Sequence, residues 1–310
     1  MANKIIFMGT PLFCVPILKS LHQNDYNIAV VYTQPPQKSN RGQKINISPI
    51  QSISETLNIE YRTPKTLKDN TEENKFLKNL NADLAIVCAY GQVIPKNFLN
   101  LTKKGFVNIH ASILPSWRGA APIQRAIMNL DSETGISIMK INEELDSGPV
   151  SNIYKIKIEQ NQNAQEISEK LSSIAAEKIL DNVDDILEDK AKFIDQDHSK
   201  ATYAKKIDKE ESRIDWDEDA SKIIGKINGL FPSPGASFSF NGERYKILKA
   251  EIGNGIGQVG EIISNQLEVA CNKNQSIKIL EIQRQGKRPQ KISEFMLGSQ
   301  IKKGSKLSNV

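Results

Sequence analysis

The chain has 310 residues, more than the ~100–150 of one typical domain, so we expect two domains. Hydrophobic residues make up 39% and charged residues 25%, with a net charge of +5. No apolar run reaches the ~18 residues of a membrane span and no signal peptide precedes the first strand, so the sequence predicts a cytoplasmic protein. The dispersed cysteines Cys14, Cys88 and Cys271 form no CxxC pair, which argues against a disulfide framework or a zinc site.

Strands and helices alternate in the first part of the chain. Short apolar runs predict strands at Lys4–Gly9, Asn27–Thr33, Asp83–Ala89, Gly105–His110, Gly135–Ile141 and Val150–Ile158. Helical spacing of apolar residues predicts helices at Leu12–Leu21, Gly119–Leu130 and, as a long amphipathic helix, about Ala164–Glu188. This alternation indicates an α/β fold with a Rossmann-like open sheet.

The character of the sequence changes after residue 190. Residues 191–209 are polar and lack periodicity, so we interpret them as a linker between domains at residues 1–190 and 210–310. After a helical stretch near Ala220–Asn228 come short β-like runs separated by Gly and Asn turns: Ala236–Phe240, Tyr245–Glu251, Gly260–Ile263, Leu267–Cys271 and Ile277–Ile282. This pattern favours a small OB-like β-barrel.

Charge is distributed unevenly along the chain. Residues 1–190 contain 21 basic and 21 acidic side chains, whereas residues 271–310 contain 9 and 2. A neutral first domain with a basic tail region favours an anionic partner such as nucleic acid. Charge alone fits a merely solvated basic surface equally well.

A long loop follows the second predicted strand. Residues 34–49 exceed the ~2–6 residues usual for such a connection and carry Lys38, Arg41 and Lys44 without an acid. A basic loop beside a catalytic face could grip a phosphate backbone or an unpaired nucleic-acid end. The alternative is a loop with no role beyond solvation.

His110 is the histidine whose setting suggests chemistry. It ends a predicted strand, where ligands of open α/β sheets bind, whereas His22 and His198 lie in polar surroundings. Asn108 is two residues earlier and therefore points to the same side. The amide can donate to a developing oxyanion and the imidazole can move a proton, although such a pair alone more often has a structural role.

Asp146 follows the next predicted strand, in the turn Leu145-Asp146-Ser147-Gly148. A carboxylate there could orient and stabilise the charge of His110, or move a proton through water. An amide that can donate to an oxyanion, an imidazole that can move a proton and a carboxylate that can stabilise it would then meet at one edge of the sheet. Acyl transfer to an amine needs all three.

A longer pattern around these residues resembles the folate-dependent formyltransferases. The chain shows Asn-x-His, then Ser112-Ile113-Leu114-Pro115, then Asp146 in a Leu-Asp-x-Gly turn. The resemblance implies catalytic roles for Asn108, His110 and Asp146, and contact of residues 112–115 with tetrahydrofolate. It also implies 10-formyltetrahydrofolate as co-substrate. Gly9-Thr10-Pro11 after the first strand is not a GxGxxG motif, so NAD is not expected, and no metal is expected either. Ile113 stands where the family usually has leucine, a volume-conserving change.

Other segments resemble the branch of this family that acts on a charged tRNA. They are Ile5–Pro11, Asp83–Pro95, Arg118–Gln124, Tyr203–Lys206 and Ile214–Trp216. The resemblance implies that the acceptor is the methionine amino group of initiator methionyl-tRNA. It further implies that Lys38, Arg41 and Lys44, together with the C-terminal domain, bind the tRNA. We expect a monomer.

Two alternatives stay open at this stage. One is a folate-dependent formyltransferase for a small amine, such as glycinamide ribotide or an amino sugar, which would need neither the basic loop nor the basic barrel. The other is a noncatalytic tRNA-binding relative, which would be expected to have lost a member of the triplet; Asn108, His110 and Asp146 are all present.

Overall fold

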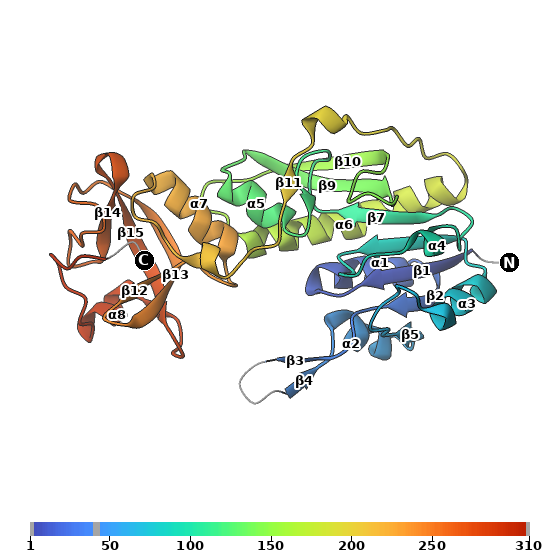
Figure 1. The fold of residues 1–310 in the computed structure, drawn as a ribbon, viewed down its shortest axis with the longest axis horizontal. Helices are drawn as coiled ribbons and strands as arrows, with labels where there is room; N and C mark the ends of the chain where they lie inside the picture. Colours follow the sequence, from blue (N-terminus) through green and yellow to red (C-terminus); the bar gives the residue numbers. More distant parts are fainter. Residues whose placement is uncertain (1–2, 40–43, 308–310) are drawn as a thin grey trace. The chain divides into compact units, whose positions relative to one another are not determined.

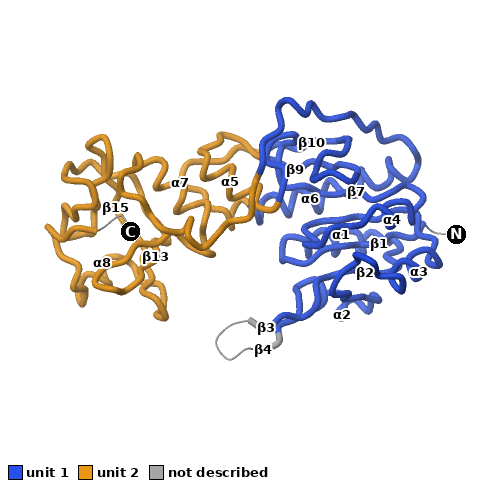
Figure 2. The backbone as a smooth tube through the Cα atoms, in the orientation of Figure 1, with its two compact units in different colours: residues 1–119, 135–155, 168–203 blue, residues 120–134, 156–167, 204–310 orange. Residues whose placement is uncertain are grey.

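A computed structural model describes residues 3–39 and 44–307, and the chain separates into two compact units (Figure 2). Unit 1 contains residues 1–119, 135–155 and 168–203, and unit 2 contains residues 120–134, 156–167 and 204–310. No helix among the described residues is long and apolar enough to cross a membrane.

Unit 1 is built around an open, mixed seven-stranded sheet (Figure 1). The strand order is β10-β9-β7-β6-β1-β2-β5. Five strands run parallel: β1 (Lys4–Gly9), β2 (Asn27–Tyr32), β5 (Tyr61–Arg62), β6 (Leu84–Cys88) and β7 (Phe106–His110). β9 (Glu133–Lys140) is antiparallel to β7 and is followed by β10 (Val150–Lys157). The predicted α/β sheet is thus confirmed, with antiparallel pairing at one edge.

The central strands are buried because their side chains are apolar on both faces, as in a sheet covered by helices. The helices of this part are α1 (Val15–Gln23), α2 (Pro49–Thr56), α3 (Thr71–Leu80), α4 (Lys96–Leu99) and α6 (Ala164–Leu187), with a 3-10 turn η1 (Leu12–Cys14). α6 lies against α1, since Ser20 donates to the carbonyl of Ala176 and Tyr26 to that of Leu180. These hydrogen bonds fix α6 to α1 and to the turn that follows α1.

Two predicted elements differ in detail from the structure. The helix expected from Leu12 begins at Val15, and Leu12 is 73% exposed rather than part of the buried stripe. The helix expected over Gly119–Leu130 is α5 (Pro122–Met128), because Arg118–Gly119 forms the short strand β8, which pairs with β11 (Tyr203–Ala204). Gly119 has a φ of 121°, which a helix cannot contain.

Unit 2 contains a five-stranded antiparallel sheet packed on α7 (Ala220–Leu230). Its strands are β12 (Ser237–Phe240), β13 (Glu243–Gly253), β14 (Glu268–Cys271), β15 (Gln275–Arg284) and β16 (Gln290–Lys291), followed by α8 (Ile292–Leu297). Trp216 lies fully buried in the core beside Phe238. The expectation of a β module after the α/β domain is confirmed as antiparallel strands. The run expected at Gly260–Ile263 forms only isolated bridges.

Candidate active site

β7 presents Asn108 and His110 at the carboxyl edge of the sheet. It pairs with β6 on one side and β9 on the other, with Val87 opposite Asn108 and Ser137 opposite His110. The His110 side chain is 6% exposed, and its Nε2 lies 3.0 Å from the carbonyl oxygen of Trp117. Because a carbonyl oxygen only accepts, this contact assigns the proton to Nε2. Nδ1 is therefore the imidazole nitrogen that can take up or release a proton.

Asp146 faces that nitrogen. Its Oδ2 lies 3.7 Å from His110 Nδ1 and accepts a hydrogen bond of 2.8 Å from the backbone N–H of Gly119. The backbone of Asp146 has a φ of 45°, a conformation uncommon outside glycine. The carboxylate is thus placed to stabilise a positive charge on His110 without capturing the neutral imidazole in a hydrogen bond.

The side-chain amide of Asn108 is half-buried. Over the described residues, 3–39 and 44–307, it makes no hydrogen bond within the chain. Its atoms are not among the buried polar atoms that lack a partner, so the amide is reachable from solvent and available for a substrate oxygen.

The loop after His110 is fixed by its own hydrogen bonds. Ser112 donates to the carbonyl of Ser116 at 2.6 Å, and Ser137 donates to the carbonyl of Ser112 at 2.7 Å. Ser112 and Leu114 are buried, whereas Ile113 and Pro115 are half-buried. In residues 112–115, then, Ser112 and Leu114 are buried and anchor the loop, while Ile113 and Pro115 keep part of their surface exposed.

Residues 191–203 also contact this region, a role that sequence reasoning missed. Thr202 accepts hydrogen bonds from the backbone N–H groups of Trp117 and Arg118. Gln196 is buried and hydrogen-bonds to both Arg118 and the Asp146 loop. No local pattern identifies these residues, because their partners lie about 50 to 85 positions away in the chain.

The structure describes the predicted basic loop only in part. Lys38 lies on β3 (Gln37–Ser39) and Lys44 on β4 (Lys44–Asn46), two short antiparallel strands that the sequence did not predict. Arg41 lies outside the described residues. At the base of the loop, Thr33 and Ser48 hydroxyls hydrogen-bond at 2.7 Å, so its two ends are held together at the carboxyl edge of the sheet.

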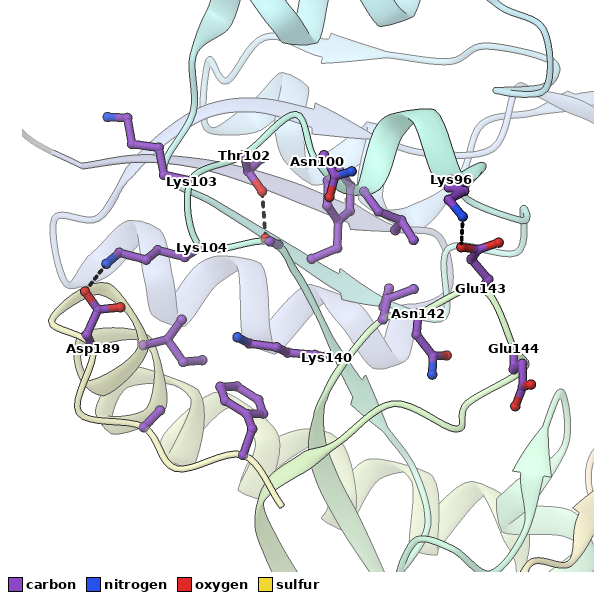
Figure 3. Close-up of a pocket in the computed structure, with 17 residues that line it drawn as sticks. Lys96, Asn100, Thr102, Lys103, Lys104, Lys140, Asn142, Glu143, Glu144 and Asp189 are labelled. Atoms are coloured by element: carbon purple, nitrogen blue, oxygen red, sulfur yellow. Dashed lines mark hydrogen bonds and ion pairs between the residues drawn. The ribbon is translucent and has the colours of Figure 1, made fainter. Parts of the chain in front are cut away.

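A cavity of about 1000 Å³ lies at the opposite end of β7 (Figure 3). Phe106, at the start of β7, lines it, as do Lys96, Lys140, Glu143 and Glu144, with Lys96 paired to Glu143. Asn108, His110 and Asp146 are not among its lining residues. The catalytic candidates therefore occupy a separate part of unit 1.

The cysteines of the chain are buried, and its acidic and histidine side chains are dispersed among the described residues. In the part of the chain that the structure describes, no three His, Cys, Asp or Glu side chains are grouped as a metal site. The three cysteines are buried free thiols, and burial raises the pKa of Cys271 to about 11 and that of Cys88 well above its ordinary value. Both shifts disfavour the thiolate, so these groups are poor nucleophiles.

The sequence matches known protein families over most of its length. The profile of a family described as "Formyl transferase" matches residues 3–183, and that of "Formyl transferase, C-terminal domain" matches residues 206–300. The chain is 65% identical to a methionyl-tRNA formyltransferase of Pelagibacter ubique over the whole of both chains. It is 40% identical to a second, from Mesorhizobium japonicum, covering 99% of this chain and 100% of that one.

A solved structure resembles the chain in fold. It is a sugar 3N-formyl transferase crystallised in the presence of dTDP and 5-N-formyl-THF, with a TM-score of 0.70 at 19% identity. The match covers 93% of this chain and 100% of that one. At such identity the comparison concerns the fold alone.

Proposed function

Because the chain belongs to the formyl transferase family, and within it to the methionyl-tRNA formyltransferases, we propose that Asn108, His110 and Asp146 carry out its formyl transfer. The chain transfers a formyl group to the methionine amino group of initiator methionyl-tRNA. The family uses a formyl-tetrahydrofolate as donor; the 10-formyl form is our proposal. The observation that carries the site is the 3.7 Å approach of the Asp146 carboxylate to His110 Nδ1 beside the unpartnered Asn108 amide.

The proposed chemistry follows from this geometry. The amine nitrogen attacks the formyl carbon, the new C–N bond forms, and the bond from that carbon to the folate nitrogen breaks. The Asn108 amide donates to the oxygen that becomes anionic in the tetrahedral intermediate. His110 accepts the proton that the amine loses, and Asp146 stabilises the resulting imidazolium. The departing folate nitrogen takes up that proton, so the step as a whole neither releases nor consumes one.

We place the folate against residues 112–115. Ser112 and Leu114 are buried and hold the loop, so Ile113 and Pro115 provide the surface that the donor contacts. Two half-buried apolar side chains suit a flat aromatic ligand, which gains from the removal of apolar area from water.

We place the tRNA on the basic loop and the C-terminal domain. Lys38, Arg41 and Lys44 belong in the sequence to the segment that follows β2, whose carboxyl end lies at the same edge of the sheet as that of β7. Residues 271–310 carry 9 basic and 2 acidic side chains. Contacts from lysine and arginine to phosphate supply much of nucleic-acid affinity. As part of this proposal we keep domains at residues 1–190 and 210–310, joined by the linker 191–209, of which residues 191–203 pack on unit 1. We also propose a cytoplasmic monomer, which light scattering of the purified chain would test.

The small-amine alternative is disfavoured by sequence identity, which is 65% to a methionyl-tRNA formyltransferase over the whole of both chains and only 19% to the sugar formyl transferase that shares the fold. The test is formyl transfer from 10-formyltetrahydrofolate to initiator methionyl-tRNA, with elongator methionyl-tRNA and free methionine as comparison acceptors. We expect transfer to the initiator alone to be efficient. Absence of transfer to all three would refute the function.

The site assignment has its own test. Asp146→Asn keeps the shape of the side chain and removes its charge, so we expect transfer to be nearly abolished while the fold is retained. A wild-type rate would remove Asp146 from the mechanism and leave the activity itself unaffected.

A further inference from the structure

Arg118 is a buried cation beside the proposed site. Its side chain is 3% exposed, and across residues 3–39 and 44–307 no carboxylate lies within ion-pair distance of it. A buried charge is costly unless polar atoms surround it. Arg118 Nε and Nη2 both donate to Oε1 of Gln196, at 3.1 and 2.8 Å, and both terminal nitrogens lie 3.5 Å from His198 Nδ1. The neutral Gln196 oxygen is therefore its main acceptor.

This contact fixes the orientation of the Gln196 amide. Because Oε1 faces the guanidinium, Nε2 must point the other way. There it donates to the backbone carbonyl of Asp146 at 2.9 Å and to that of Gly148 at 2.7 Å. Both hydrogens of the amide are used on one turn of the chain, and Gln196 is 8% exposed, so water does not easily replace them.

The turn that Gln196 holds needs support. Asp146 has a φ of 45°, a conformation that costs free energy for a residue other than glycine and persists only where neighbours enforce it. Its carboxylate is held by the N–H of Gly119, the residue that follows Arg118. Asp146 is thus fixed in two ways. Gly119 holds its carboxylate directly, and Arg118 holds its backbone carbonyl through Gln196.

We propose that Gln196 is a positioning residue for Asp146, with its amide linking the Arg118 guanidinium to the Asp146 turn so that the carboxylate stays opposite His110. The inference rests on the proposed function of Asp146. It assigns a part in the reaction to a residue in the polar segment after α6. The side chain of Gln196 hydrogen-bonds to Arg118, Asp146 and Gly148 and not to His110.

Two substitutions separate the functions of the amide. Gln196→Glu keeps an acceptor for Arg118 and removes both donors to the turn, while Gln196→Met removes donors and acceptor. We expect both variants to lower kcat by about tenfold to a hundredfold, the range for misplacing a catalytic group by about 1 Å. The KM values for folate and for methionyl-tRNA should change by less than about threefold, because binding surfaces are unaltered.

The matched control is Gln51→Met. Gln51 is also 8% exposed and hydrogen-bonds through its amide, but to Glu55 and Tyr61. This control shows how much the loss of an equally buried amide lowers protein stability, which is measured as the thermal midpoint. We expect Gln51→Met to lower the midpoint and leave kcat unchanged.

The outcomes are distinct. A kcat for Gln196→Glu within threefold of the wild type would overturn the positioning role, as would a loss in Gln196→Met that the Gln51→Met control reproduces. Asp146→Asn is assayed in parallel. If that variant is inactive while the Gln196 variants are fully active, only this inference fails; if Asp146→Asn is fully active, the proposed site fails.

Discussion

Replacing Gly148 by alanine would place a Cβ atom 1.9 Å from the carbonyl oxygen of Lys140. Ordinary Cβ contacts lie beyond 3.0 Å, so the two backbone segments must separate by the difference, at least about 1.1 Å. The backbone fixes the position of the Cβ, and the Lys140 oxygen is itself a backbone atom, so no side-chain rotation can relieve the overlap. Gly148 lies two residues after Asp146, so the displacement reaches the carboxylate that faces His110.

Two effects determine how far the kcat of Gly148→Ala is expected to fall. Lengthening the 3.7 Å separation of Asp146 Oδ2 and His110 Nδ1 by this amount weakens their attraction by about 1 kcal/mol at an effective dielectric constant of about 20, roughly a fivefold rate effect. Misplacing a reacting group by about 1 Å can cost about 10²-fold. Positioning therefore outweighs the Coulomb effect, and we expect kcat of Gly148→Ala to fall between about fivefold and a hundredfold.

The assay is single-turnover transfer to methionyl-tRNA, with circular dichroism to confirm folding. Gly298→Ala is the control, because Gly298 has a φ of −118° and an added Cβ there meets no atom within 4 Å. A kcat within twofold of the wild type for a folded Gly148→Ala protein would refute the reasoning, since the strain would then have been relieved away from Asp146.

Three further predictions concern other parts of the chain. His110→Ala should reduce transfer by about 10²- to 10⁴-fold with a little-changed thermal midpoint, and an undiminished single-turnover rate would contradict the site. Arg41→Ala should raise the KM for methionyl-tRNA several-fold and reduce its salt dependence without changing the KM for folate; an unchanged KM would exclude the loop role. Arg125 donates to Glu211 at 2.9 Å and holds the pKa of that carboxyl below its ordinary value of 4.5. Glu211→Gln should therefore lower the free energy of unfolding by about 1 kcal/mol at pH 7. The difference between the variant and the wild type should shrink as the pH falls below 4.5, because the ion pair stabilises the folded state only while Glu211 is ionised. Urea denaturation at pH 7 and at pH 4 measures it, and a difference independent of pH would contradict the ion pair.

Strands with uniform apolar runs were the most predictable elements. β1 has the predicted bounds Lys4–Gly9, and β7 begins one residue inside its predicted start. Such runs are decided locally, since only burial on both faces suits them. Helices α2 and α3 were missed, although the side chains of their N-cap residues, Ser48 and Asn70, accept hydrogen bonds from the first turn of each helix. Capping signals needed more weight than periodicity there.

The candidate site was predictable to different depths. The common direction of Asn108 and His110 follows from strand geometry, whereas the approach of Asp146 to 3.7 Å depends on a turn at positive φ that no local pattern specifies. Gln196 and Thr202 were beyond sequence reasoning, because a polar stretch without periodicity looks the same whether it is solvated or hydrogen-bonded to a distant turn. Long-range polar contacts of this kind carry no sequence period.

The segment 191–203 belongs to unit 1 through Gln196 and Thr202, although it follows the last helix of the sheet region. Exchanges of the C-terminal domain between family members must therefore leave residues 191–203 in place. A chimaera that joins a foreign C-terminal module directly after α6 would lack residues 191–203, which brace the Asp146 turn. A change in its activity would then reflect an altered catalytic domain and not a new acceptor preference. A graft made after Tyr203 would carry that brace along, so exchange of acceptor specificity within this family should be sought at junctions downstream of that residue.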